Sequence, residues 1–325
     1  MVTFTLLKTN KISKVFITGA LGHIGSRILR EIPTFYPEAQ IVMLDNMSSQ
    51  RYCSLFNLPV QGKYHFIEGD VLEVNLGEIV KGADVVLHLA AITDAANSFR
   101  NKKKVEEFNY NATVKVAEAC RDNNCPMIHI SSTSVYGTQL DVVDEDCSGE
   151  QLRPQSPYAE TKLKEESFLK ALGASGALRF VICRFGTIYG VSPGMRFHTA
   201  VNKFCWQAVM GQPITVWKTA MDQKRPYLGV GDAVRAIKFI IKENLFDGEI
   251  YNVVTSNNTV RDIVDTIKKH IPGLKCDLVD SEIMNQLSYH VLSKRFESKG
   301  FICKDDIKKG IKETIYLLKN TSRLW

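Results

Sequence analysis

The sequence has no long apolar run and no paired cysteines of the kind that bind metal. No stretch approaches the roughly 18 consecutive apolar residues that a membrane-spanning helix requires. None of the eight cysteines forms a Cys-x-x-Cys pair, and the seven histidines are not spaced as in a zinc site. Residues 1–14 contain no apolar stretch that ends in a small-residue cleavage site. We therefore expect a cytoplasmic protein with reduced thiols, no metal site and no membrane contact.

The charge balance gives little sign of nucleic-acid binding. Lys and Arg number 41 against 35 acidic residues, so the formal net charge is only +6 over 325 residues. The lysine run at 102–104 has no interleaved aromatic side chains on which bases could stack. We expect no nucleic-acid partner, although a mild basic excess is compatible with an anionic small ligand. The 45% of hydrophobic and 23% of charged residues exclude a mostly disordered chain.

Short apolar runs alternate with longer amphipathic stretches through the first half of the chain. The predicted strands are 14–18, 40–44, 64–68, 85–89, 127–131 and 179–184, and the main predicted helices between them are 22–32, 105–123 and 158–172. This order favours an α/β fold, a doubly wound parallel Rossmann sheet with helices on both faces. After residue 190 the alternation weakens, with helical patterns at 232–242, 260–270 and 304–319. We expect a dinucleotide-binding domain at 1–190, to which 214–245 returns, and mainly a smaller C-terminal α+β substrate-binding lobe at 191–325.

A glycine-rich segment follows the first predicted strand directly and opens the first helix. Gly19 can take the tight turn, Gly22 lets the backbone approach a diphosphate, and Gly25 lets the helix pack closely on the sheet. The helix N-terminus then presents free N–H groups and a positive dipole end to the phosphates. The spacing is G-x-x-G-x-x-G, which differs from the G-x-G-x-x-G of many dehydrogenases and is a weak signal alone.

The acidic residue at the end of the second strand strengthens this interpretation. Asp45 lies twenty positions after Gly25, where a carboxylate accepts hydrogen bonds from an adenosine ribose. An acid at this place repels a 2′-phosphate, so NAD is favoured over NADP. Arg51 is near enough in sequence to keep NADP open. The alternative is that Asp45 only caps a turn with Asn46.

A tyrosine and a lysine share one face of a later predicted helix. Tyr158 and Lys162 are at i and i+4, so the ammonium can favour the phenolate and make the tyrosine a base. Lowering the phenol pKa by about 3 units needs about 4 kcal/mol of differential interaction. Hydroxyl side chains at 131–134 end the fifth strand, where such sheets bind ligands. The alternatives are an exposed helix face and a hydroxyl-rich turn without chemistry.

Taken together, these motifs resemble those of the extended short-chain dehydrogenases/reductases, in the NAD-dependent nucleotide-sugar epimerase/dehydratase family, similar to UDP-glucose 4-epimerase. The resemblance runs from about residue 14 to residue 293. It implies NAD as cofactor and a nucleotide-diphosphate sugar as substrate. The catalytic residues that it implies are Ser132, Tyr158 and Lys162. The cofactor-binding residues that it implies are Gly19, Gly22, His23, Ile24, Gly25, Asp45, Asn46, Asp70, Val71, Leu89, Ala90, Ala91, Asn109, Tyr158, Lys162 and Phe185. The implied substrate-binding residues are Thr133, Thr187, Arg225 and Ser288, with Arg225 on the diphosphate.

Departures from the family pattern narrow the expected reaction. Members that dehydrate the sugar have an acid in the triplet before Val-Tyr-Gly, whereas this chain has Ser132-Thr133-Ser134. Without that carboxyl, no group protonates a leaving hydroxide, so dehydration is disfavoured. Thr187 replaces the usual asparagine, and the register of Ser288 would admit an N-acetylated sugar. The sugar and the nucleotide base therefore stay open.

The resemblance thus predicts 4-epimerisation through transient oxidation at C4 to a keto sugar, followed by return of the hydride. A one-way 4-keto-sugar reductase, which uses the same residues, is the alternative, with a dehydratase behind it. A non-catalytic dinucleotide sensor is expected to have lost the Tyr158/Lys162 pair, which is present. The resemblance also implies a homodimer through helices 105–123 and 158–172, although burial of their apolar positions against the subunit's own sheet explains these equally well.

Overall fold

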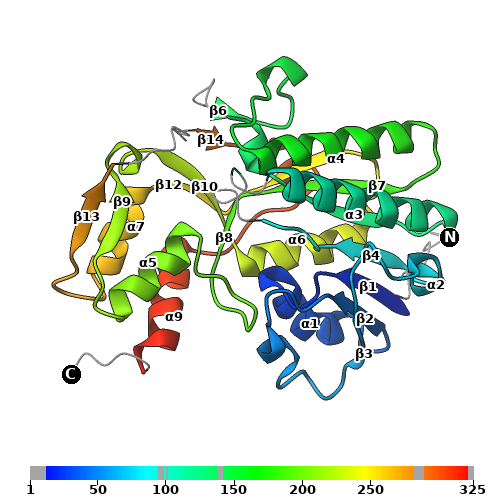
Figure 1. Cartoon of the computed structure of the whole chain (residues 1–325), viewed down its shortest axis with the longest axis horizontal. Coiled ribbons are helices and arrows are strands. Elements are labelled where there is room, and N and C mark those ends of the chain that lie inside the picture. Colours follow the sequence, from blue (N-terminus) through cyan, green and yellow to red (C-terminus); the bar gives the residue numbers. More distant parts are fainter. Residues whose placement is uncertain (1–11, 94–98, 100–101, 138–141, 281–288, 321–325) are drawn as a thin grey trace, which may run out of the picture.

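The central feature of the protein is a seven-stranded parallel sheet, seen here in a computed structural model (Figure 1). The structure describes residues 12–93, 99, 102–137, 142–280 and 289–320. The strand order is β11-β7-β5-β4-β1-β2-β3, and each neighbouring pair is parallel. The strands are β1 (Lys14–Thr18), β2 (Gln40–Asp45), β3 (Lys63–Glu68), β4 (Val85–His88), β5 (Met127–Ser132), β7 (Phe180–Phe185) and β11 (Ile250–Val253). The chain crosses over in opposite directions from β1, which is the doubly wound arrangement.

The strands form where continuous apolar runs can be buried on both faces. Every residue of β4 and β7 is buried, as is typical of a parallel sheet covered by helices. The six predicted strands are confirmed to within two residues at either end. The sequence analysis missed β11, whose fully buried Ile-Tyr-Asn-Val run contains a polar residue. Asn252 is accommodated there because its side chain accepts from the Tyr136 hydroxyl and donates to the Leu292 carbonyl.

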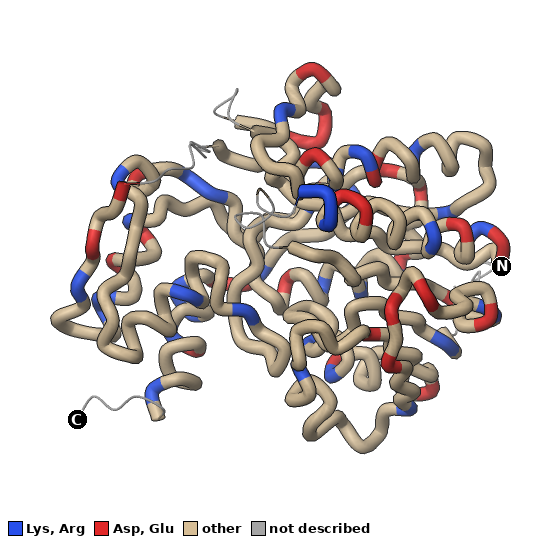
Figure 2. The backbone as a smooth tube through the Cα atoms, viewed as in Figure 1, with Lys and Arg blue, Asp and Glu red and all other residues tan. Residues whose placement is uncertain are grey.

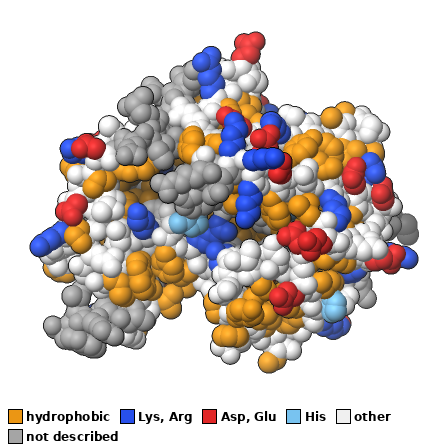
Figure 3. Space-filling view, viewed as in Figure 1, with side chains coloured by type: hydrophobic (Ala, Val, Ile, Leu, Met, Phe, Trp, Pro, Cys, Tyr) orange, Lys and Arg blue, Asp and Glu red, His pale blue; other side chains and the backbone are white. Residues whose placement is uncertain are grey.

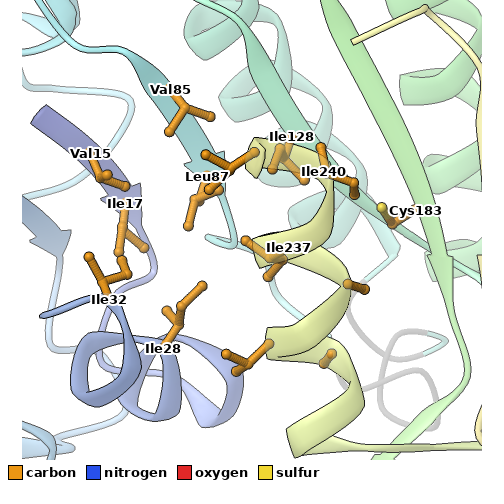
Figure 4. Close-up of a cluster of buried hydrophobic side chains, with 14 of the residues drawn as sticks. Val15, Ile17, Ile28, Ile32, Val85, Leu87, Ile128, Cys183, Ile237 and Ile240 are labelled. Atoms are coloured by element: carbon orange, nitrogen blue, oxygen red, sulfur yellow. The ribbon is translucent and has the colours of Figure 1, made fainter. Parts of the chain in front are cut away.

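Helices cover both faces of this sheet, which confirms the predicted fold class. On one face lie α1 (His23–Phe35) and α6 (Val230–Glu243), whose isoleucines pack together against strand side chains such as Ile17 and Leu87 (Figure 4). On the other face lie α2 (Leu76–Val80), α3 (Lys102–Asp122) and α4 (Pro157–Ala174). Val116 of α3 and Leu169 of α4 are buried there with Phe16 and Val86. The subunit's own sheet therefore accounts for these apolar helix positions.

A smaller part of the molecule lies beside one end of the sheet, at the left of Figure 1. It contains a three-stranded sheet in the order β12-β10-β8 and a two-stranded sheet of β13 and β9. Its strands are β8 (Thr187–Tyr189), β9 (Ile214–Trp217), β10 (Lys224–Gly229), β12 (Ser256–Thr259) and β13 (Cys276–Val279). Its helices α5 (Ala200–Val209), α7 (Val260–Lys268) and α9 (Ile307–Lys319) enclose a separate apolar core. The remaining elements are β6 (Val142–Val143), β14 (His290–Val291) and α8 (Lys294–Ser298).

Residues 214–245 divide between the two parts. Strands β9 and β10 pair within the smaller sheets, whereas α6 packs beside α1 on the central sheet. The domain boundary at residue 190 stays a prediction. Figure 2 shows basic and acidic residues interspersed along both parts, so the net charge is not gathered on one of them. Within the ranges described above, no helix is both long enough and apolar enough to cross a bilayer.

We expect Ile237→Ala to destabilise the protein, because Ile237 is fully buried between α6 and the central sheet. Truncation of such a side chain costs about 2–5 kcal/mol through lost burial and the cavity left behind. Urea unfolding followed by circular dichroism measures the change. Lys242→Ala on the exposed side of the same helix is the control and should change stability by less than about 0.5 kcal/mol. An equal change in both variants would show that burial of Ile237 does not contribute to stability.

Candidate functional site

Two adjoining cavities open at the carboxyl ends of the central strands, beside the segments that follow β1 and β4. Their volumes are about 290 Å³ and about 480 Å³. They share five lining residues, which are Gly19, Gly22, Leu89, Ala91 and Arg196. Together they form one elongated groove at the place where doubly wound sheets bind ligands. Figure 3 shows Lys, Arg and His side chains near the middle of the face, between the two parts of the molecule.

Most of the predicted site residues line this groove. Those in the smaller cavity are Gly19, Gly22, His23, Ile24, Gly25, Leu89, Ala91, Ser132, Tyr158, Lys162, Phe185 and Thr187. Those that line the larger cavity also include Asp45, Asn46, Asp70, Val71 and Ala90. Residues that are far apart in the sequence are thus brought to one edge of the sheet.

The glycine turn is built so that backbone, rather than side chains, faces the groove. Gly19 has a φ of +63°, and a Cβ on it would lie 2.6 Å from the backbone nitrogen of Ala90. A Cβ on Gly25 would lie 2.4 Å from the carbonyl oxygen of Ala20. Gly22 caps α1 without a side-chain hydrogen bond, so the first N–H groups of this helix stay available to an anion. This cradle fits a diphosphate.

Asp45 caps turns and also lines the groove, so its predicted role at the ribose stays a prediction. Its Oδ2 accepts from the backbone N–H of Leu21 at 3.0 Å, and its Oδ1 accepts from Met47 at 3.0 Å. The carboxylate therefore orders the glycine turn and its own turn while it lines the larger cavity. Asn46 donates to Asp70 at 2.9 Å, which ties the ends of β2 and β3 together. An adenosine ribose fits this acidic end.

The three predicted catalytic residues meet in the smaller cavity. Tyr158 is the second residue of α4, which begins at Pro157 and is capped by the Ser156 hydroxyl through the N–H of Ala159. The Lys162 Nζ lies 5.9 Å from the centre of the Tyr158 ring, and the lysine is only 3% exposed. On the opposite strand end, the Ser132 hydroxyl accepts from Ser134. The i, i+4 spacing brings Tyr158 and Lys162 to the cavity together, and the end of β5 adds Ser132.

The electrostatics of Tyr158 differ in one respect from the sequence argument. Burial raises the pKa of the phenol, Lys162 and Arg196 oppose that increase, and Glu165 adds to it. The net direction is upward, so the lysine alone does not produce a phenolate. Burial alone would lower the pKa of Lys162, but the Glu165 carboxylate and the phenol outweigh it and raise that pKa. A second positive charge beside the phenol, such as the nicotinamide ring of the NAD that the resemblance implies, would favour the phenolate.

A segment that the sequence analysis missed lies directly on the glycine turn. Burial lowers the pKa of His23 to about 4, so its ring is neutral, and its Nε2 lies 2.8 Å from the Gly190 carbonyl. The Ser192 hydroxyl donates to the His23 carbonyl, and the N–H of Gly194 donates to Ser26. A Cβ on Gly194 would lie 2.3 Å from the Leu21 carbonyl oxygen. Residues 190–194, which we call the junction segment, are therefore packed backbone to backbone on the phosphate loop.

The residues after the junction segment add basic and hydroxyl groups to the groove. Arg196, His198 and Thr199 line the smaller cavity, and Arg196 also lines the larger one. The signal in the sequence was the pair of basic residues a few positions after Tyr189-Gly190. Its meaning depends on the fold of the junction segment, which local patterns do not reveal.

Three predicted residues lie outside the lining of these cavities as the structure describes it. Asn109 hydrogen-bonds both the N–H and the carbonyl of Ile92, so it steadies the backbone after β4. Thr133 donates to the Phe185 carbonyl. Arg225, on β10, donates to Gln223 at 2.9 Å. One more predicted residue, Ser288, is not among the residues that the structure describes.

Comparison with known proteins places these features in context. Residues 15–253 match the model of the NAD dependent epimerase/dehydratase family. The chain is 28% identical to the trifunctional UDP-glucose 4,6-dehydratase/UDP-4-keto-6-deoxy-D-glucose 3,5-epimerase/UDP-4-keto-L-rhamnose-reductase RHM1 of Arabidopsis thaliana, over 96% of this chain and 48% of that protein. It therefore spans about half the length of that relative. It is 30% identical to the uncharacterized UDP-glucose epimerase YtcB of Bacillus subtilis, over 74% of this chain and 76% of that protein.

A solved structure agrees with the fold. The UDP-glucuronic acid 4-epimerase of Bacillus cereus, in complex with UDP-glucuronic acid and NAD, superposes with a TM-score of 0.83. The match covers 95% of this chain and 99% of that one at 23% identity, which bears on the fold alone.

We expect Gly194→Ala to weaken NAD binding, because the added Cβ would meet the backbone of Leu21 and Gly22 and push the phosphate loop out of place. The loss in affinity should be tenfold or more, which corresponds to about 1.4 kcal/mol. Isothermal titration calorimetry with NAD measures it. Gly149→Ala, where a Cβ meets nothing within 4 Å, is the matched control and should bind as the parent does. Parent-like affinity of the Gly194 variant would show that the junction segment does not constrain the loop.

Proposed function

This chain belongs to the NAD-dependent epimerase/dehydratase family, and from that premise we propose that it is a nucleotide-diphosphate-sugar 4-epimerase. The observation that carries the proposal is the smaller cavity, in which Ser132, Tyr158 and Lys162 converge. No carboxylate stands among the described residues that line it. The described lining of this cavity therefore offers a base, hydroxyls and cations, but no carboxylic acid.

The proposed roles follow from these groups. Tyr158, as phenolate, accepts the proton of the sugar 4-hydroxyl and returns it after the carbon has been inverted. Ser132 hydrogen-bonds the same oxygen and holds it in place. Lys162 favours the phenolate electrostatically and is placed to bind the nicotinamide ribose. NAD, when bound, supplies the reversible oxidation of C4.

The surroundings of the base support an anionic substrate and argue against dehydration. Lys162, Arg196 and His198 line the smaller cavity, so a diphosphate would be drawn to it. The name of the plant relative includes a 4,6-dehydratase activity. Loss of water from the sugar needs an acid to protonate the leaving hydroxide, and the described cavity lining provides hydroxyls such as Ser132 and Ser134 instead.

The binding of the sugar nucleotide's diphosphate by Arg225 is part of this proposal. Arg225 lies outside the cavity lining, and burial lowers its pKa, but the Tyr289 phenol is close enough to oppose that decrease. The Tyr289 hydroxyl donates to the Thr133 carbonyl, beside the catalytic strand end. We assign the diphosphate to this side of the groove, with Arg225 as its predicted arginine.

A homodimer through α3 and α4 also remains part of the proposal.

An epimerase and a reductase differ in whether they consume reduced cofactor. An epimerase takes its hydride back in each cycle and works with bound NAD alone, whereas a 4-keto reductase consumes one reduced cofactor per turnover. Purified protein incubated with UDP-, GDP-, CDP- and dTDP-sugars should equilibrate one pair of 4-epimers from both sides without added NADH or NADPH. Stoichiometric consumption of reduced cofactor would establish the reductase instead.

We expect Tyr158→Phe to lower kcat by about 10²–10⁴-fold, because it removes the only proton acceptor proposed for the 4-hydroxyl. NAD affinity should stay within about twofold of the parent, since the ring remains. Product analysis gives kcat, and calorimetry gives the affinity. Tyr316→Phe, which removes a hydroxyl from a tyrosine 79% exposed on α9, is the control and should be fully active. Full activity of the Tyr158 variant would refute the assignment of the base.

A further inference from the structure

A carboxylate and an imidazole that belong to none of the motifs above lie directly behind Lys162. Glu165 follows Lys162 by three residues on α4 and is 0% exposed. Its Oε2 accepts from Lys162 Nζ at 2.8 Å and lies 3.1 Å from Nε2 of His129. His129 is also fully buried, on β5, three residues before Ser132. The base, its cation and this pair therefore form one line from the groove into the core.

This arrangement is costly if its only purpose is to hold the fold together. Burying an ion pair costs desolvation, and apolar replacements of such pairs are often as stable or more stable. The cluster is also incompletely satisfied, because Glu165 Oε1 and both ring nitrogens of His129 have no hydrogen bond of good geometry among the described residues, although Nε2 lies 3.1 Å from Glu165. A buried polar group that is only partly satisfied calls for an explanation other than stability.

The neighbouring carboxylate shows what a purely structural pair looks like in the same helix. Glu166 accepts two hydrogen bonds from the Arg184 guanidinium, at 2.9 and 2.6 Å, and a third from Ser131. Arg184 in turn lies 4.9 Å from the centre of the Tyr136 ring. Glu166 thus has its own arginine as partner.

We propose that Glu165, with His129 beside it, is a positioning residue for the reaction, which fixes the Lys162 ammonium and sets the charge that acts on the Tyr158 phenol. This inference rests on the proposed role of Tyr158 as the base. It goes further in that two residues outside the expected catalytic set determine the strength of that base.

The charges around Glu165 leave it as the anion that acts on Lys162. Lys162 faces it from α4, His129 from β5, and His88 of β4 stacks on His129 with ring centres 5.9 Å apart. Burial lowers the pKa of His129 and brings that of His88 to about 3, so both rings are neutral at working pH. Burial alone would raise the pKa of Glu165, but Lys162 and His129 outweigh it and lower that pKa to about 2. Glu166, although paired with Arg184, makes a smaller contribution that raises the pKa of Lys162 in the same direction as Glu165.

The direction of the expected effect follows from the sign of this charge. An ionised Glu165 disfavours the phenolate and favours the ammonium, so it raises the pKa of both Tyr158 and Lys162. Replacing it with a neutral residue should let the Tyr158–Lys162 pair lose its first proton at lower pH. With NAD bound, the positive nicotinamide favours loss of that proton from the phenol. The rising limb of activity with pH should move in the same direction.

The test is an ultraviolet titration of the NAD-bound protein, read as the phenolate absorbance of each variant minus that of its Tyr158→Phe counterpart. We expect Glu165→Gln to move the Tyr158 midpoint down by about one pH unit. If the buried amide prevents folding, Glu165→Met removes the same charge without burying a polar group and should give the same shift. The pH profile of kcat/KM, measured on the nucleotide sugar found to react, should shift to lower pH by the same amount.

Glu145→Gln is the matched control. Glu145 is a buried carboxylate that accepts from the backbone N–H of Asn252 at 3.0 Å, outside both cavity linings as described. Its replacement should leave the Tyr158 midpoint where it is in the parent. A folded Glu165 variant whose midpoint coincides with that of the parent would overturn the inference. Because this titration needs no turnover, that result is distinct from an active Tyr158→Phe, which would refute the proposed function.

Discussion

The site depends on close contact between two backbones at the point where the sheet changes direction. The turn after β1 touches the chain that follows β4, because Gly19 has no side chain to separate them. Thr18 and His88 are partners in the register of β1 and β4, and their side chains are joined at 2.8 Å. His88 also bonds Thr113 of α3, which anchors the same point to the helix layer. The groove opens beside this contact, with Gly19 and Leu89 in the lining of both of its cavities.

One helix then supplies the reactive groups in a fixed order. Pro157 and the Ser156 cap define where α4 begins, and the 3.6-residue repeat places Tyr158, Lys162 and Glu165 in succession from the groove inward. The position of the helix start thus decides where the phenol lies relative to Ser132. A shift of one residue at this terminus would turn the tyrosine by about 100° away from the strand end. Rigid secondary structure therefore does the positioning that flexible loops would do less accurately.

Short-range patterns in the sequence were sufficient to predict the elements and motifs that short-range geometry determines. The glycine spacing, the acid at the end of β2 and the Tyr158/Lys162 pair each depend on short-range geometry, and all of them line the groove. The missed features depend on the tertiary fold. Asn252 makes β11 look too polar for a central strand until its hydrogen bonds to Tyr136 and Leu292 are known. The contact of Gly194 with the phosphate loop joins residues about 170 positions apart, which no periodicity reports.

The junction segment has a kinetic consequence. Several buried hydrogen bonds link this segment to His23 and Ser26 in the first turn of α1, so they oppose local opening of the loop backbone. Cooperative openings of this kind are rare and slow compared with the motion of a free loop. A ligand that the loop holds would consequently dissociate slowly. A long residence time would suit the proposed epimerase, in which a single dinucleotide serves many turnovers.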